Sequence, residues 1–126
     1  MLSVLLLALV NSLSVNASFP ICGEGRRFTC VVDGDTFWHN RIKYRLADID
    51  APEVSKPKCR AEARQGQAAT YRLAALLNAG RFELLWQGVD RYGRTLATVR
   101  RSGRSIGGQL VSEGLARRWD DRRGWC

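Results

Sequence analysis

Three short clusters of charged residues hold the side chains of this chain that could do chemistry. A phosphodiester resists hydrolysis because its anionic oxygens repel a nucleophile. A hydrolase therefore needs cations on those oxygens, a group that activates water and, often, a metal held by carboxylates. A hairpin turn or surface ion pairs would explain any one cluster alone, so the case for a site rests on their occurring together. The clusters are Asp33-Gly34-Asp35-Thr36, the segment from Arg45 to Glu53, and the segment from Asp90 to Arg94.

Carboxylates and guanidinium groups in these clusters have complementary roles. Asp35 and Asp50 offer hard oxygen ligands of the kind that calcium prefers. Glu53 follows Asp50 by three residues, so it can face the same pocket and act on water. Arg45 and Arg94 each present a planar fork that can hold two phosphate oxygens at once. The residue types therefore predict a metal-assisted site for phosphodiester hydrolysis.

Short strands and one long helix must position these side chains. Runs of β-formers and alternating apolar residues, separated by turn signals, predict strands near 28–32, 36–38, 42–49, 82–86 and 96–99. Helical spacing of apolar residues predicts one long helix from about 61 until Asn78-Ala79-Gly80, and a short helix over about 105–113. The expected fold class is α+β, mainly β: a five-stranded OB-fold Greek-key barrel with one long and one or two short helices. The open face of such a barrel commonly binds oligonucleotides.

Length and charge narrow the class of protein. The chain has 126 residues, 45% of them hydrophobic, which suits one compact domain. Lys and Arg total 20 against 12 Asp and Glu, so the formal net charge is +8 and the surface should attract a polyanion. Nucleic acid and anionic membrane both fit that charge, as does a basic surface that serves solubility alone. No amphipathic basic helix supports docking on a membrane.

The N-terminus has the pattern of an export signal. Residues 1–10 are almost wholly apolar, and residues 11–17 become small and polar and end in Val15-Asn16-Ala17. An apolar stretch of about nine residues is too short to span a bilayer of about 30 Å. We expect a signal peptide over residues 1–17, one domain over residues 18–126, and a secreted or periplasmic protein without a stable membrane span.

The four cysteines fit an oxidising compartment. An even number of cysteines in a small exported chain favours two disulfides, for which three connectivities exist. A zinc site is disfavoured because the chain has no C-x-x-C pair and His39 is its only histidine. We favour Cys22 with Cys30 and Cys59 with Cys126, because a bridge to the last residue would hold a tail that otherwise frays.

The motifs in these clusters resemble those of the thermonuclease, or staphylococcal nuclease-like, family. The similar segments occur in the order of the family and are Val31 to Thr36 (VVDGDT), Arg45 to Glu53 (RLADIDAPE) and Asp90 to Ala97 (DRYGRTLA). The similarity continues through Gly66, the long helix and the segment from Leu110 to Ala116, so it covers roughly residues 29 to 118.

The resemblance implies a role for each matched residue. Asp35 and Asp50 would bind calcium through their carboxylates, Ala51 through its backbone carbonyl, and Glu53 would be the general base. Arg45 and Arg94 would clamp the phosphate and stabilise the transition state. The family cleaves DNA and RNA to leave 3′-phosphate ends. Lesser roles are implied for Asp33 and Thr36, which would orient ligands, and for the substrate-binding residues Tyr92 and Arg91.

The chain also departs from the family pattern. The aromatic residues that stack on the base in the family are not matched directly, and Trp119 is the candidate to replace them. Ala51 stands where the best-known member has Thr, which leaves the carbonyl ligand intact. Trp119 and Trp125 lie among arginines, as in surfaces that bind single strands. Trp38 and Trp86 lie in expected strands, where packing is a simpler explanation than base stacking.

Together these observations predict a calcium-dependent endonuclease acting on DNA and/or RNA, a monomer with no obligate protein partner. The alternative is a non-catalytic OB-fold protein that binds nucleic acid. A pure binder has no need of a carboxylate cluster facing a polyanion, which favours the nuclease.

Overall fold

A computed structural model describes residues 12–126 of the chain. Residues 1–11, the larger part of the expected signal peptide, lie outside the described residues. The main sheet has the strand order β1-β6-β7-β4-β3-β2, and β8 pairs with β7. The strands of this sheet are β1 (Ser12–Val15), β2 (Cys30–Asp33), β3 (Thr36–His39), β4 (Ile42–Leu46), β6 (Phe82–Val89), β7 (Thr95–Arg101) and β8 (Arg104–Ser105).

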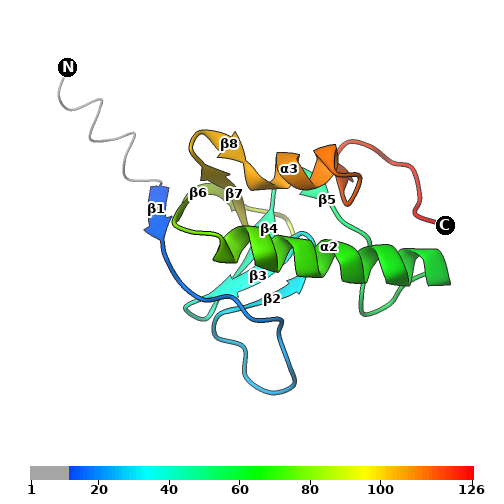
Figure 1. Ribbon diagram of the computed structural model, residues 1–126, viewed down its shortest axis with the longest axis horizontal. Coiled ribbons are helices and arrows are strands. Elements are labelled where there is room, and N and C mark those ends of the chain that lie inside the picture. The colour runs from blue at the N-terminus through cyan, green and yellow to red at the C-terminus, as the bar shows by residue number, and fades with distance from the viewer. Residues whose placement is uncertain (1–11) are drawn as a thin grey trace.

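Two helices and a small second sheet complete the domain. Helix α2 crosses in front of the main sheet, and α3 lies above it beside β5 (Figure 1). The strands β5 and β9 pair antiparallel with each other, which ties the segment after β4 to the C-terminal part of the chain. The bounds of these elements are α2 (Arg60–Asn78), α3 (Ile106–Ser112), β5 (Ile49–Asp50) and β9 (Arg117–Arg118).

The expected fold class, α+β and mainly β with an OB-type sheet, is confirmed. The five expected strands correspond to β2, β3, β4, β6 and β7, and both expected helices are present. The short strands β1, β8 and β9 were not predicted. Most pairs in the main sheet are antiparallel, but β4 and β7 run parallel, which brings the second charged cluster next to the start of β7. The parallel pairing of β4 with β7 thus brings the charged clusters together.

The core lies between the sheet and α2. Strand residues alternate between the core and the surface, so one face of each central strand supplies large apolar side chains. Fully buried residues from the loop, the strands and the helix fill this space, among them Phe19, Phe37, Leu46, Leu73 and Phe82. Phe19 contacts Phe37 edge-on, with ring centres 5.8 Å apart. This packed core holds the strands in place and so fixes the positions of the charged side chains on their outer face.

Helix α2 begins and packs in a way that supports the site. The sulfur of Cys59 accepts a hydrogen bond from the Glu62 N–H, and the Glu62 carboxylate accepts one from the Lys58 N–H at 2.6 Å. The Cys59 sulfur thus pairs an N–H group that the first turn leaves without a backbone partner, and the Glu62 carboxylate holds the residue before the cap. Within the helix, a Cβ atom on Gly66 would lie 2.7 Å from the carbonyl oxygen of Glu53. Glycine therefore allows the Glu53 segment to pack directly on the helix backbone.

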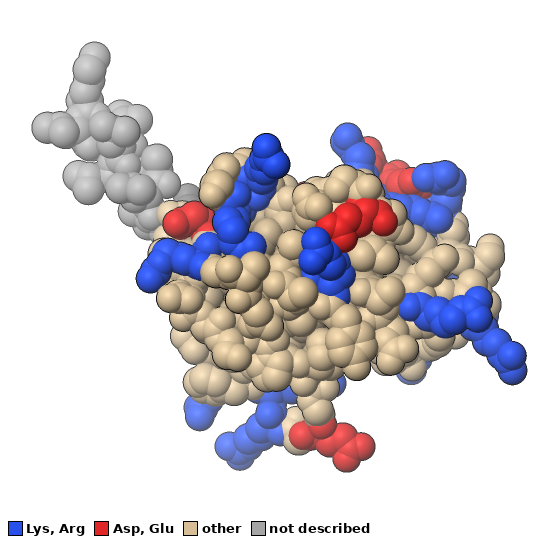
Figure 2. All heavy atoms as spheres, viewed as in Figure 1, with Lys and Arg blue, Asp and Glu red and all other residues tan. Residues whose placement is uncertain are grey.

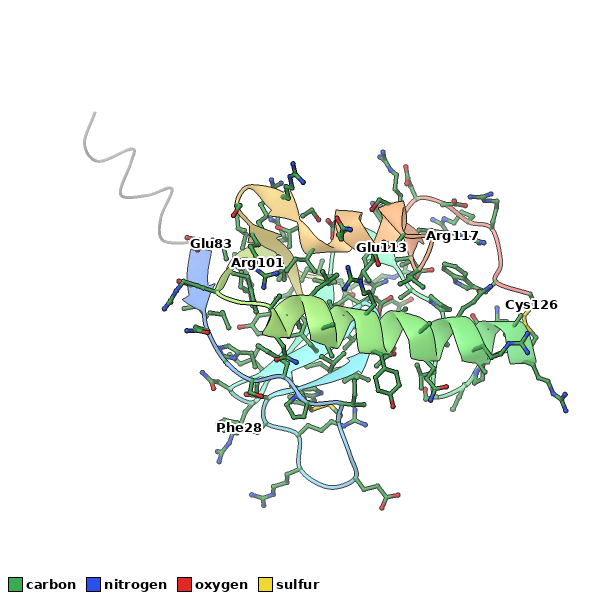
Figure 3. The ribbon with its side chains drawn as sticks, in the orientation of Figure 1. Phe28, Glu83, Arg101, Glu113, Arg117 and Cys126 are labelled. Carbon is green, nitrogen blue, oxygen red and sulfur yellow. A yellow bond between two sulfur atoms is a disulfide. The ribbon has the colours of Figure 1, made fainter. Side chains whose placement is uncertain are left out.

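Both favoured disulfides are present in the structure. Cys22, in the loop before β2, bonds to Cys30 at the start of β2, and Cys59 bonds to Cys126. Cys126 lies at the first turn of α2 (Figure 3), so the second bridge holds the C-terminal tail against the start of the helix.

Removing the Cys59–Cys126 bridge is expected to lower the free energy of unfolding by about 2–4 kcal/mol, because a bridge across a long loop restricts the unfolded chain. The bridge joins residues 67 positions apart. Urea unfolding of a Cys59→Ser/Cys126→Ser variant measures the loss while serine keeps a helix-capping side chain at position 59. A Cys126→Ser single variant should lose the same amount. An unchanged urea midpoint in both variants would show that the bridge adds no stability.

The strand β1 belongs in sequence to the expected leader. Its four residues pair with the β6 segment from Phe82 to Leu85, and Val15 is buried in the core. Cleavage after Ala17 would therefore remove an edge strand and make that part of β6 the new edge of the sheet, paired with β7 alone. Phe19 follows the expected cleavage position and is held separately, because its N–H and carbonyl both bond to the Asn78 side chain.

Candidate active site

The first charged cluster forms the tight turn between β2 and β3. Asp35 is only 6% exposed, and its carboxylate accepts hydrogen bonds from the Thr36 hydroxyl at 2.9 Å and the Ala51 N–H at 2.8 Å. A Cβ atom on Gly34 would lie 2.7 Å from the Cβ of Ala69, closer than packed carbon atoms come. The glycine thus lets the turn press against α2, which holds the Asp35 carboxylate against the segment after β5.

Arg45 joins the first cluster to the second. Its Nη2 atom lies 3.4 Å from Asp35 Oδ2 and 3.3 Å from Asp50 Oδ1. Its Nη1 atom donates to the backbone carbonyls of Leu46 and Ile49. The expected strand over 42–49 is wrong in one respect: it stops after Leu46 and resumes at Ile49, since the backbone bends so that both carbonyls face the guanidinium. The bend carries Asp50 to the side of Asp35.

Asp50 and Glu53 both have raised pKa values. The largest cause of each pKa shift is burial, followed by the negative charge of Asp35, while Arg45 acts in the opposite direction. Like charges held this close disfavour full ionisation, so the site favours a bound cation. The Glu53 carboxylate has no hydrogen bond or ion pair with any residue in the described part of the chain. It is therefore free to accept a proton.

Asp33 lines the groove in the same turn as Asp35. Its Oδ1 atom accepts a hydrogen bond from the Asp35 N–H at 3.3 Å. Burial and the neighbouring charge of Asp35 raise the pKa of Asp33 to about 8. The direction of this pKa shift means that the surroundings of Asp33 disfavour a second negative charge beside Asp35. Asp33 is placed to orient the turn that carries Asp35.

The third cluster is an exposed turn between β6 and β7. Asp90 accepts a hydrogen bond from Arg94 Nε at 2.6 Å and others from the N–H groups of Tyr92 and Arg94. The Arg94 guanidinium lies 5.5 Å from the centre of the Tyr92 ring, and the Arg91 guanidinium lies 4.9 Å from it. Asp90 therefore holds Arg94 by one edge. The side-chain hydrogen bond between Arg94 and Asp90 uses Nε and neither Nη atom.

Most of the expected site residues line a single groove with a volume of about 1000 Å³. Arg91 and Tyr92 do not line this groove but adjoin it through the contact of Tyr92 with Arg94. Ala51 lies beneath it, where its N–H holds Asp35. The expected residues that line the groove are Asp33, Asp35, Thr36, Arg45, Asp50, Glu53 and Arg94.

The structure does not bring Trp119 to this groove. Trp119 is 61% exposed and lines a separate pocket beside Asp48 and Ser105. Trp125 is engaged elsewhere, because the guanidinium of Arg117 lies 4.0 Å from the centre of its ring. Neither tryptophan is positioned beside Glu53 to stack on a base bound there.

Among the groove residues that sequence reasoning missed are three basic side chains and one aromatic side chain, namely Arg27, Arg41, Lys43 and Trp38. A signal for one of them was present, since Lys43 alternates with Arg45 along a strand and must share its face.

Lys and Arg side chains elsewhere project mainly around the edges of the face that carries α2, whose centre is largely uncharged (Figure 2).

The donors available for a metal are two carboxylates and backbone oxygen. Within residues 12–126, no group of three or more His, Cys, Asp and Glu side chains could hold a metal ion. Asp35 and Asp50 nonetheless both contact one guanidinium nitrogen of Arg45, so their carboxylates already share a positive charge. Hard carboxylate oxygens completed by water suit calcium, which accepts flexible coordination. The donor set fits calcium.

These features define an OB-fold domain whose open face holds carboxylates and arginines in one groove. Residues 43–124 match the family described as "Staphylococcal nuclease homologue". The chain belongs to this family. The matched segment begins after the Asp33–Thr36 turn, which the structure brings to the same groove.

Curated relatives agree with this assignment. The chain is 36% identical over 93 residues to an uncharacterised endonuclease of Haemophilus influenzae, covering 74% of this chain and 46% of that protein. It is 38% identical over 122 residues to the micrococcal nuclease of Shigella flexneri, covering 86% and 64%. It is 32% identical over 106 residues to the thermonuclease of Staphylococcus intermedius, covering 80% and 63%. The chain spans less than two thirds of the length of each of these relatives.

Proposed function

We propose that the chain is a calcium-dependent endonuclease that hydrolyses phosphodiester bonds in DNA and/or RNA. The observation that carries the proposal is the convergence of Glu53, Arg45 and Arg94 with the carboxylates of Asp35 and Asp50 in one groove. A site that only bound nucleic acid would gain nothing from a carboxylate cluster facing phosphate. The names of the relatives, which include two nucleases, support the same activity.

The residues of the groove divide the chemistry among them. Arg45 and Arg94 hold the phosphate oxygens and stabilise the additional negative charge of the transition state. Glu53 accepts a proton from water as the water oxygen bonds to phosphorus. The bond from phosphorus to the 5′ oxygen then breaks, that oxygen takes a proton from solvent water, and Glu53 releases its proton to solvent. The products are a 3′-phosphate and a 5′-hydroxyl end.

In this mechanism Arg94 binds the phosphate while its side chain stays hydrogen-bonded to Asp90. The contact with Asp90 uses Nε, so both Nη atoms stay available to a substrate oxygen. The hydrogen bonds from Asp90 to the turn backbone fix the direction of the Arg94 side chain. Asp90 is therefore a positioning residue for the second half of the phosphate clamp.

Calcium would be held by Asp35, Asp50 and the carbonyl of Ala51. When bound, it supplies positive charge to the phosphate and lowers the pKa of coordinated water. The hydrogen bonds from Thr36 and Ala51 keep the Asp35 carboxylate oriented for this role. Arg45 shares these carboxylates, which couples the phosphate clamp to the cation site.

The proposed activity is tested by incubating the purified protein with end-labelled single-stranded DNA and RNA in calcium. We expect internal cleavage to fragments that carry 3′-phosphate ends, which phosphatase treatment makes extendable by a polymerase. A contradictory result is binding of the oligonucleotide without cleavage, or fragments that carry 5′-phosphates.

We also propose export, with the leader over residues 1–17 removed and the enzyme acting as a monomer outside the cytoplasm. Two disulfides support an oxidising compartment. No helix in the described part of the chain is long and apolar enough to cross a membrane. The position of β1 in the sheet makes the exact point of cleavage consequential for the stability of the released domain.

A further inference from the structure

The groove extends beyond the carboxylates along the hairpin of β3 and β4. Arg27, Trp38, Arg41 and Lys43 line this extension, and none of them takes part in the chemistry described above. We refer to these four residues as the hairpin track. The track is continuous with the phosphate clamp, because Arg45 lines the same groove.

The register of the hairpin places the track residues in line with the clamp. Thr36 pairs with Arg45, and Trp38 pairs with Lys43, so each pair projects from the same outer face. Residues two apart on a strand are separated by roughly 7 Å. Lys43 and Trp38 therefore lie one step further along the face from Arg45, toward the turn that ends at Arg41.

The cations of the track are unneutralised. Arg27, Arg41 and Lys43 are exposed and form no ion pair within residues 12–126. Arg45 and Arg94, in contrast, contact carboxylates. Three positive charges on one side of a groove, with no nearby acid bound to them, produce a local field that favours an extended anion.

The turn at the end of the track is fixed by the loop that precedes β2. The Arg41 N–H donates to the Phe28 carbonyl at 2.9 Å, and the Arg41 guanidinium lies 5.4 Å from the centre of the Phe28 ring. Phe28 lies at the lower edge of the molecule, on that loop (Figure 3). The loop is in turn closed by the Cys22–Cys30 bridge. Arg41 has φ +70°, a backbone conformation in which glycine is the usual residue, so arginine adopts it at a conformational cost.

Trp38 is difficult to explain by packing alone. Its indole Nε1 is buried, with no hydrogen-bond acceptor among the described residues. A buried unpaired donor is unfavourable, so phenylalanine would pack at lower cost. The indole ring of Trp38 lies in a groove beside basic side chains, which is the arrangement that stacks on a base.

We propose that the hairpin track binds the phosphates and a base of a polynucleotide strand on one side of the scissile bond. This inference rests on the proposed nuclease function and extends it to the length of the substrate. From Arg45 to Arg41 the hairpin spans roughly 13 Å. A strand stacked as in duplex DNA, with about 3.4 Å per nucleotide, needs about four nucleotides to cover that distance, and a more extended strand needs fewer. The enzyme therefore favours strands of several nucleotides over dinucleotides.

The test compares Lys43→Ala and Arg41→Gly with Arg104→Ala, which removes an exposed charge on β8 outside the groove. Glycine at position 41 suits the observed backbone. For a 12-nucleotide strand we expect each track variant to raise KM about fivefold with kcat nearly unchanged, and to reduce the salt dependence of binding by about one unit of slope. Cleavage of a dinucleotide should not change. Arg104→Ala should match the wild type.

A binding measurement separates this proposal from the proposed activity. Fluorescence anisotropy of the labelled 12-nucleotide strand, in chelator, reports affinity without cleavage. If the wild type binds but never cleaves, the nuclease function fails while weaker binding by the track variants still supports the track. Equal affinities for the wild type and both track variants would overturn the track, as would an equal loss in Arg104→Ala.

The role of Trp38 is tested with two substitutions. Loss of a stacked base weakens binding by about fivefold to 100-fold, so Trp38→Ala should do so, whereas Trp38→Phe should retain most of the affinity. If Trp38→Phe binds as weakly as Trp38→Ala although both unfold at the temperature of the wild type, stacking on Trp38 is excluded.

Discussion

Replacing Glu53 with glutamine is expected to lower kcat for cleavage of single-stranded DNA by about 10²- to 10⁴-fold, the range that general-base catalysis supplies. Glutamine keeps the shape of the side chain but cannot take the proton from water. The effect should fall on kcat, because the Glu53 carboxylate has no hydrogen bond or ion pair with another described side chain whose loss would disturb substrate binding.

The matched control for Glu53→Gln is Glu24→Gln. Glu24 is an exposed acid in the loop before β2, so Glu24→Gln removes the same charge at a place away from the carboxylate cluster. Circular dichroism and thermal unfolding should be unchanged in both variants. An active Glu53→Gln enzyme, within a fewfold of the wild type at every pH, would remove Glu53 from the role of general base.

Arg45 is expected to give a comparably large effect through transition-state stabilisation. Its guanidinium contacts two carboxylates and two backbone carbonyls, yet lines the groove with Arg94. Arg45→Lys keeps the positive charge but loses the planar fork. Removal of one such preorganised donor typically costs about 10²- to 10³-fold in kcat. We expect that loss in Arg45→Lys, measured under saturating substrate.

Arg45→Ala should differ from Arg45→Lys in stability. Without the guanidinium, the Asp35 carboxylate is left buried without its cationic partner, and two carbonyls lose their donor. Thermal unfolding should therefore show a clear decrease in Tm for alanine and a smaller one for lysine. If Arg45→Lys retained the full kcat, a single point charge would suffice and the proposed clamp would be wrong.

The fold was predictable where local patterns dominate. Strands β2, β3, β6 and β7 and helix α2 each have a clear apolar period and a turn or cap at the ends, such as Asn78-Ala79-Gly80 after α2. The interruption between Leu46 and Ile49 was not predictable, because it depends on the contact of the Arg45 side chain with two carbonyls that are near only in the folded chain. The strands β1 and β9 depend likewise on distant partners.

The candidate site was predictable in its residue types but not in its extent. Three carboxylates grouped in this way have few structural roles, so the sequence pointed to a catalytic role for Asp35, Asp50 and Glu53. The hairpin track was missed because Arg41 and Lys43 appear as ordinary surface cations until the turn is seen against Phe28. The location of Trp119 was likewise not predictable, because its place in the sequence suggested base stacking at the carboxylate groove. Its backbone is held beside Asp48, and it faces a different pocket.

The dependence of cleavage on calcium tests the central claim most directly. One sample of the protein is assayed on single-stranded DNA in calcium, again after calcium is removed with EGTA in excess magnesium, and a third time after calcium is restored. We predict loss of cleavage in EGTA and full return with calcium, because Asp35 and Asp50 present the hard oxygen donors that calcium binds. Undiminished cleavage in EGTA would contradict the account.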